Sequence, residues 1–153
     1  LYLSGGVYLG GTGAANKLED YEEGTYDVAV TCGTSGTITV AGAYNQMQYT
    51  KIGRVVTASG LIVMSAISSP VGILRISLPF VNSDLGERSS DTAVALVING
   101  SVANTAGSYV GYIVEGQQYI QIFEGDAATY GTASANQIQA SSTIWFQATY
   151  TTP

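Results

Sequence analysis

The apolar segments of this chain are too short and too regularly interrupted for helices, and this constrains the fold more than any other feature. From Tyr26 onward they run for about five to ten residues, with turn residues about every 8 to 12 positions. Apolar and polar residues alternate within them, and the 3.6-residue period of an amphipathic helix is missing. Glycine accounts for 19 of the 153 residues. The pattern predicts an all-β domain of about eight or nine strands.

The spacing of these segments favours an antiparallel β-sandwich or a jelly-roll-like domain. The expected strands cover residues 28–32, 37–40, 44–52, 55–66, 73–78, 92–98, 109–114, 119–124 and 143–150. Gly53-Arg54 and Asn99-Gly100 are expected to form tight turns between strands, because such dipeptides suit short hairpin loops. Pro70 is expected to end the longest strand, because proline cannot donate to a regular ladder.

The N-terminal segment contains a short repeat. Leu1-Tyr2-Leu3 followed by a glycine pair recurs as Val7-Tyr8-Leu9 followed by another glycine pair. Two such units cannot bury their own apolar faces, so we expect them to continue an upstream stack or to wind together with other copies. A simple hydrophobic N-terminal strand is the alternative. Because the sequence starts within this pattern and without methionine, we interpret it as part of something longer.

An acidic segment follows the repeat. Glu19, Asp20, Glu22 and Glu23 lie close together and repel one another, so we expect a solvated linker or a single helical turn there. Their spacing does not match an EF-hand loop, which makes a Ca²⁺ site the less favoured interpretation. The predicted domain boundary falls here. Residues 1–25 are expected to form the end of a trimeric stem and a linker, and residues 26–153 the C-terminal β-sandwich domain.

The charge of the chain excludes several kinds of partner. Five basic residues face eleven acidic ones, which gives a net charge of −6. So few cations cannot neutralise a run of phosphates, so we expect no nucleic-acid partner and no adhesion to anionic lipid. The longest apolar stretch, residues 60–67, is the length of a strand, so membrane insertion as a helix is not expected.

The residues of common catalytic and metal sites are also missing. The sequence has no histidine, which excludes Ser-His-Asp and Cys-His catalysis and imidazole-based metal sites within this chain. Cys32 is the sole cysteine, and we expect it to be a small buried apolar residue. No metal and no cofactor are expected. Carboxylates such as Asp84, Asp91 and Glu115 could pair across strands for glycoside hydrolysis, and the sequence leaves that open.

Two motifs have simple structural explanations. Gly10-Gly11-Thr12-Gly13 resembles a dinucleotide fingerprint, but no strand–helix–strand unit follows it, so we interpret it as a flexible turn. Asn99-Gly100-Ser101 is a glycosylation sequon. It also contains the commonest hairpin dipeptide, and the turn is the simpler interpretation.

Two expected strands carry aromatic residues on the face opposite to their core residues. These outward residues are Trp145 on strand 143–150, and Tyr119 and Phe123 on strand 119–124. Three interpretations stay open. The aromatics could be incidental, they could form a second buried face through subunit contact, or they could be a platform on which sugars stack. The eleven tyrosines of the chain suit both of the last two.

Three segments together resemble the C-terminal domain of bacteriophage tail fibres and tailspikes. YLGGTGAANKLEDYEEGTY resembles the family's junction after the fibrous stem, which typically has the form Asn-x-Leu-Asp-Asp-Tyr-Glu-Glu-Gly-Thr-Trp. This chain departs at Glu19 and Tyr26, and Asp27-Val28 replaces the usual Thr-Pro. YTKIGRVVTASG resembles the family's Tyr-Thr-Lys-Ile-Gly-x-Val-Val pattern, and ILRISLPF resembles its Leu-Pro-Phe element. The resemblance covers residues 7–80.

The resemblance implies a homotrimeric, β-rich distal module of a virion appendage that is exposed to the extracellular medium. Such a module follows a fibre stem, helps to trimerise or cap it, and often faces the host surface. The implied partners are two further copies, the upstream fibre stem, and a host-cell-surface polysaccharide or other receptor. Depolymerases of that family carry their active sites in an upstream β-helix, so we expect no enzymatic activity in this domain.

The candidate residues follow from these arguments. The expected trimer interface consists of apolar residues of the repeat and the outward aromatics, namely Leu1, Leu3, Val7, Leu9, Tyr119, Phe123 and Trp145. Receptor contacts are expected on loops 101–108 and 125–135, because loops on rigid scaffolds carry binding. There Asp126 would accept hydrogen bonds from sugar hydroxyls and Tyr130 would stack on a sugar ring. The alternatives are a trimerisation cap or capsid-decorating fibre tip without a ligand and a glycan-degrading enzyme domain.

Overall fold

The computed structural model describes residues 5–13, 16–18, 20–102, 108–125 and 130–153. Strands dominate it, and two short 3₁₀ helices, η2 (Gly42–Tyr44) and η3 (Ser134–Gln137), interrupt them. The strands are β1 (Val7–Tyr8), β2 (Lys17–Leu18), β3 (Tyr21–Asp27), β4 (Val30–Cys32), β5 (Ser35–Val40), β6 (Gln46–Ile52), β7 (Val55–Val71), β8 (Leu74–Ser77), β9 (Thr92–Asn99), β10 (Ser108–Ile113), β11 (Tyr119–Gly125), β12 (Tyr130–Gly131) and β13 (Thr143–Thr151).

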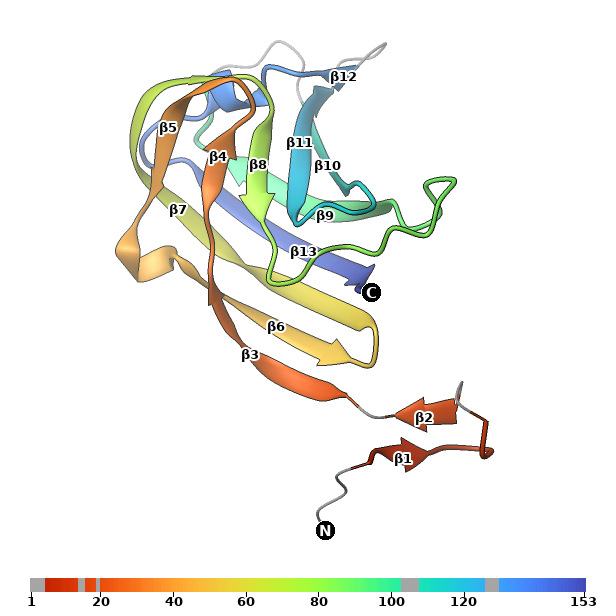
Figure 1. Ribbon diagram of the computed structural model, residues 1–153. Coiled ribbons are helices and arrows are strands. Elements are labelled where there is room, and N and C mark those ends of the chain that lie inside the picture. Colours follow the sequence, from red (N-terminus) through yellow and green to blue (C-terminus); the bar gives the residue numbers. More distant parts are fainter. Residues whose placement is uncertain (1–4, 14–15, 19, 103–107, 126–129) are drawn as a thin grey trace.

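The larger sheet curls into two layers over one core (Figure 1). Its strand order is β3-β6-β7-β13-β9-β10-β11-β8-β4, and β5 and β12 join it by pairing with β7 and β11. The first half of β7 pairs with β6 and β13, whereas its second half pairs with β5. β9 is shared in a similar way between β10 and β13. The expected antiparallel β-sandwich is therefore confirmed.

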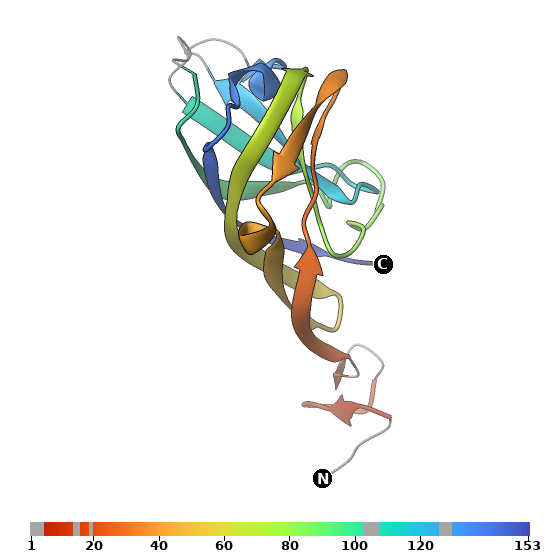
Figure 2. The same ribbon diagram turned by 90° about the vertical axis from the view of Figure 1, so that its left-hand side faces the viewer.

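The N-terminal and η3 ends of the molecule lie far apart. β1 and β2 form a small antiparallel hairpin outside the sandwich. Both views place this hairpin, drawn in red, at one end, and η3 with β12, drawn in blue, at the other (Figures 1 and 2). The sandwich thus separates the β1–β2 hairpin from β12 and η3.

The core follows the alternation of the sequence. Residues at every second position of β7, β8, β11 and β13 point inward. The fully buried side chains among them include Val56, Ile62, Met64, Leu74, Ile76, Ile120, Ile122 and Ile144. Burying each large aliphatic side chain contributes about 1.5–3 kcal/mol to folding. The expected orientation of the aromatics is confirmed, because Trp145, Tyr119 and Phe123 lie on the opposite side from these residues.

Pro70 does not end the longest strand, contrary to the expectation. β7 continues to Val71 because its register with β5 shifts at this point, which leaves Ser69 and Pro70 in a bulge. A bulge takes the proline nitrogen out of the hydrogen-bond ladder. The bulge also requires glycine at position 36, which has a φ of 86°, because a Cβ there would come 2.1 Å from the Ser69 carbonyl oxygen.

The two expected tight turns have different outcomes. Gly53-Arg54 is confirmed as the turn between β6 and β7, where Ile52 pairs directly with Val55. The prediction that Asn99-Gly100 closes a tight hairpin is wrong, because within the described residues β9 and β10 pair only through Thr92, Ala93 and Val94 and not next to this dipeptide. β9 leaves β10 after Val94 and pairs with β13 instead, because the two layers share this strand. The Gly100 carbonyl accepts a 2.9 Å hydrogen bond from Ser142 and so ties the end of β9 to the start of β13.

The acidic segment is also different from the expectation. Residues 21–27 form strand β3 and pair along its whole length with β6, so they are neither a solvated linker nor a helical turn. Partners on β6 offset the repulsion between the carboxylates. The Lys51 ammonium pairs with Asp20, and the Tyr49 hydroxyl donates to Glu22. β3 crosses the expected boundary between residues 25 and 26, and the stem role of residues 1–25 stays a prediction.

The last strand anchors the long loop that follows β8. The Tyr150 side chain is only 2% exposed, and its hydroxyl donates a 3.0 Å hydrogen bond to the Phe80 carbonyl. The Phe80 amide donates to the same hydroxyl over 3.2 Å. Burial raises the pKa of Tyr150 to about 12, although the hydrogen bond to Phe80 works against it, so the phenol stays a neutral donor.

We expect Tyr150→Phe to destabilise the domain by about 1–3 kcal/mol, because it leaves both buried backbone groups of Phe80 without a partner. Chemical denaturation followed by circular dichroism measures the change. Tyr44→Phe is the matched control, because Tyr44 is exposed and should tolerate the same loss of a hydroxyl. Equal stability of the two variants would show that the link to Phe80 contributes nothing.

Candidate functional site

The outer face of the sheet carries an apolar patch on its central strands. Strand pairing places Leu61, Trp145 and Val97 side by side on β7, β13 and β9, and we call these three residues the Trp145 patch. Trp145 is 44% exposed and Val97 is 61% exposed. A hollow of about 450 Å³ adjoins them, and no charged residue lines it. Isolated exposed apolar residues are ordinary, whereas a group with a tryptophan is typical of a contact surface.

A polar region adjoins this patch toward β3. Gln48 Nε2 donates to Ser59 Oγ over 3.1 Å, and the Thr57 and Thr149 hydroxyls are also 3.1 Å apart. Gln48, Thr57 and Ser59 line a hollow of about 490 Å³ over β3, β6 and β7. Thr149 lies on the adjoining strand β13. Because the hydroxyls and amides largely satisfy one another, we do not assign a ligand to this region.

An aromatic hollow lies on the other side of the patch, over β10 and β11. The rings of Tyr112 and Phe123 stack with 5.3 Å between their centroids and 13° between their planes. The strand register explains the contact. Val110 pairs with Phe123, so Tyr112, two residues further along the same face of β10, lies diagonally across from Phe123. On its other side Tyr112 pairs with Ala93 of β9. The aromatic hollow has a volume of about 360 Å³, and its lining consists of Ala93, Val110, Gly111, Tyr112, Phe123 and Tyr130.

Tyr130 reaches this hollow because β12 extends the edge of β11. Gly125 pairs with Tyr130, which is 69% exposed. The following helix η3 is fastened to the core by Ser134, whose hydroxyl donates to the Ile122 carbonyl over 2.5 Å and accepts from the Leu74 amide over 2.8 Å. The sandwich therefore holds the chain on the C-terminal side of Tyr130.

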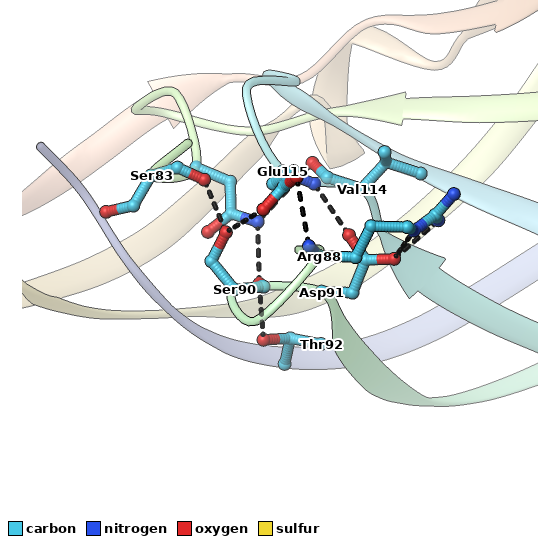
Figure 3. A network of polar contacts seen from close by, with 8 residues as sticks. Ser83, Arg88, Ser90, Asp91, Thr92, Val114 and Glu115 are labelled. Carbon is cyan, nitrogen blue, oxygen red and sulfur yellow. Dashed lines mark hydrogen bonds and ion pairs between the residues drawn. The ribbon is translucent and has the colours of Figure 1, made fainter. Parts of the chain in front are cut away.

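A network of polar contacts shapes the loop before β9 (Figure 3). Arg88 Nε donates to Asp91 Oδ2 over 2.7 Å, and the Arg88 amide donates to the Glu115 carboxylate over 3.2 Å. Asp91 Oδ1 accepts the Glu115 amide over 2.8 Å. Ser90 completes the link by donating to the Ser83 carbonyl over 2.5 Å.

The same contacts hold an unusual backbone. Gly86, Glu87 and Arg88 have successive positive φ angles of 74°, 53° and 58°. Residues with a side chain rarely adopt this region, so the loop depends on its hydrogen bonds to stay in this conformation. The result is a fixed position for the Arg88 side chain.

The groups of this network change one another's pKa values. Burial raises the pKa of Asp91, but the Glu115 amide and the Arg88 guanidinium outweigh it and lower this pKa below its usual value. Asp91, and to a smaller extent Tyr112, raise the pKa of Arg88 above its usual value. Arg88 and Asp91 thus form a charged pair in the loop before β9.

The structure places the predicted interface residues in different surroundings. Val7 and Leu9 are exposed at the N-terminal hairpin, and Trp145 is exposed on β13. Tyr119 and Phe123 are half-buried and already have partners, since Arg75 lies 4.9 Å from the Tyr119 ring and Tyr112 stacks on Phe123. Leu1 and Leu3 lie outside the described residues. The interface role of all these residues stays a prediction.

Of the two predicted receptor contacts, Tyr130 lines the aromatic hollow, and Asp126 lies outside the described residues. Sequence reasoning missed Tyr112. Strand alternation could have placed Tyr112 on the outer face, opposite the buried Ile113. Its contact with Phe123 depends on the pairing of β10 with β11, which alternation alone does not specify.

The described residues contain no group of three Asp, Glu, Cys or His side chains that could hold a metal ion. No helix in the described part of the chain has the length and hydrophobicity of a membrane span.

No protein-family model matches this sequence, and no curated protein matches it. Among solved structures, the chain is similar to the Dettilon tailspike protein, with a TM-score of 0.72 and 15% identity. The similarity covers 86% of this chain and 24% of that one. The chain shares its fold with part of a tailspike. The tailspike-like fold expected from the sequence motifs is thus confirmed, and at this identity the likeness concerns the fold alone.

The Asp91 network gives a pH-dependent prediction. Because the folded-state pKa of Asp91 is depressed, its contribution to stability is present above its unfolded pKa of about 3.9 and is lost as pH falls through the folded value. We expect Asp91→Asn to lower the melting temperature at pH 7, and the difference from wild type to shrink below about pH 4.

Thermal melts over this pH range test the expectation, with Asp84→Asn as a control for an exposed aspartate in the same loop. A difference between Asp91→Asn and wild type that stays constant with pH would contradict a role for the carboxylate charge.

Proposed function

We propose that this chain is a distal structural module of a phage tail fibre or tailspike, which trimerises the appendage and contacts a glycan on the host surface. The observation that carries the proposal is the fold shared with a tailspike over 86% of this chain. The proposal places the protein in the virion and assigns it assembly and binding, with any catalysis in another part of the appendage.

The Trp145 patch supports subunit assembly. A single copy leaves Trp145, Val97 and the adjoining hollow of about 450 Å³ open to water, and the lining of that hollow has no charge to oppose a second copy. Tryptophan is enriched among the residues that dominate the energy of protein interfaces. Closed rotational symmetry buries the same patch on every copy, as a fibre needs.

The N-terminal residues of the predicted interface fit the same arrangement. Val7 and Leu9 are exposed on or beside the hairpin at one end of the molecule, where packing against other copies would bury them. Leu1 and Leu3 belong to the same proposal on the strength of the repeat. Tyr119 and Phe123 are the weaker candidates, because each already contacts another side chain of its own chain.

The position of Tyr130 supports a role in receptor contact. β12 lies at the opposite end of the molecule from the N-terminal hairpin (Figures 1 and 2). If residues 1–25 join the stem, the β12 end faces away from it and toward the host. A trimerisation cap without a ligand is the alternative, and binding to host polysaccharide distinguishes the two.

Light scattering at micromolar and nanomolar concentrations tests the assembly. We expect a mass of about three chains of 15.9 kDa for the wild type. Trp145→Glu should shift the mass toward one chain, because it buries an unpaired charge at the proposed contact. Tyr44→Glu, which alters an exposed aromatic residue on η2, should leave the mass unchanged.

Circular dichroism must show the wild-type strand content in both variants, since Trp145 points away from the core. A wild-type mass of one chain at every concentration would overturn the trimer. A folded Trp145→Glu variant that keeps the mass of three chains would show that the interface does not include the Trp145 patch.

A further inference from the structure

We propose that the aromatic hollow is a binding site for one neutral pyranose ring of a glycan, with Tyr112, Phe123 and Tyr130 as stacking residues and the Tyr112 and Tyr130 hydroxyls as hydrogen-bonding groups. The inference rests on the proposed function, because it names the place and the chemical class of the host-surface ligand. It is carried by the geometry of the hollow and by the side chains around it.

The size of the hollow suits a small ligand. Its volume of about 360 Å³ lies at the lower end of the range for small-molecule pockets, which is about 300–1,000 Å³. That space accommodates a sugar ring with its substituents. An extended protein partner would instead need a broad complementary surface, such as the one that the Trp145 patch offers beside it.

The chemistry of the lining separates this hollow from the Trp145 patch. A pyranose has apolar C–H faces and a rim of hydroxyls, so its site needs aromatic surfaces and hydrogen-bonding groups together. Tyr112, Phe123 and Tyr130 supply three rings and two phenol hydroxyls. The hollow beside Trp145 has a single amide side chain, Gln147, among its otherwise apolar lining. We therefore assign the first hollow to a sugar and the second to a subunit contact.

The lining of the hollow favours a neutral sugar. None of the described residues that line it is charged. These residues therefore offer no cation to the carboxylate of an acidic sugar, whereas their phenol hydroxyls can both donate to and accept from sugar hydroxyls.

The site is held in place before any ligand binds. The stacking of Tyr112 on Phe123 restricts both rings. Side chains that are already ordered lose little conformational entropy on binding. Tyr130 is the exposed member of the set, so its substitution can be made without disturbing the core.

Saturation-transfer difference NMR with the intact chain tests the proposal. The probes are the methyl α-pyranosides of glucose, galactose and mannose, with N-acetylneuraminic acid as the acidic comparison. We expect transfer to the ring C–H protons of at least one neutral probe, with a dissociation constant of about 1 mM, as is typical of one small ligand in a shallow site. We expect weaker transfer or none to the acidic probe.

Variants locate the binding site. Tyr130→Ala should weaken binding about tenfold through the loss of one stacking ring, and Tyr130→Phe should retain most of the affinity. Tyr44→Ala, which removes an exposed tyrosine elsewhere, should leave binding unchanged. The variants should keep the wild-type circular dichroism spectrum.

Three results would overturn the proposal: no transfer to any neutral probe, binding of the acidic probe alone, or full affinity in Tyr130→Ala. The proposed function has separate tests in the mass of the assembly and in binding to whole host polysaccharide. If Tyr130→Ala still binds the polysaccharide as a trimer, the glycan contact lies elsewhere and only this inference fails.

Discussion

The pairing of β7 with three partners is the constraint on which the rest of the structure depends. Its first half lies between β6 and β13, and its second half pairs with β5 beyond a change of direction. The bulge at Ser69 and Pro70 and the glycine opposite it allow one strand to serve both regions of the sheet. β13 lies between β7 and β9, and in this position its Trp145 side chain is exposed to solvent.

The outer face of the same sheet divides into regions with different chemistry. Hydroxyl and amide side chains over β3, β6 and β7 largely bond to one another. The Trp145 patch is apolar, and the aromatic hollow combines rings with phenols. This division is the basis of the proposed contact between copies in the middle of the face and of the proposed sugar site at its margin.

Much of the local structure could be predicted, because a period of two residues is a property of each strand alone. The inward positions of Ile120 and Ile144 and the outward position of Trp145 follow from it directly. The failures occur where partners overrule local preference. Asn99-Gly100 does not close a tight hairpin, because the end of β9 pairs with β13 and not with β10. The acidic residues in and before β3 lie along β6 because Tyr49 and Lys51 bind Glu22 and Asp20.

The sequence by itself determined the fold class, the faces of the main strands and the absence of histidine chemistry, since composition and alternation need no knowledge of neighbours. Only the tertiary structure decided which outward residues meet. Tyr112 and Phe123 stack because β10 and β11 pair in one register, and Arg88 meets Asp91 because the loop before β9 is tied to Glu115. Register and loop closure depend on the competition of all strands for partners, so contacts between distant residues cannot be obtained from local pattern.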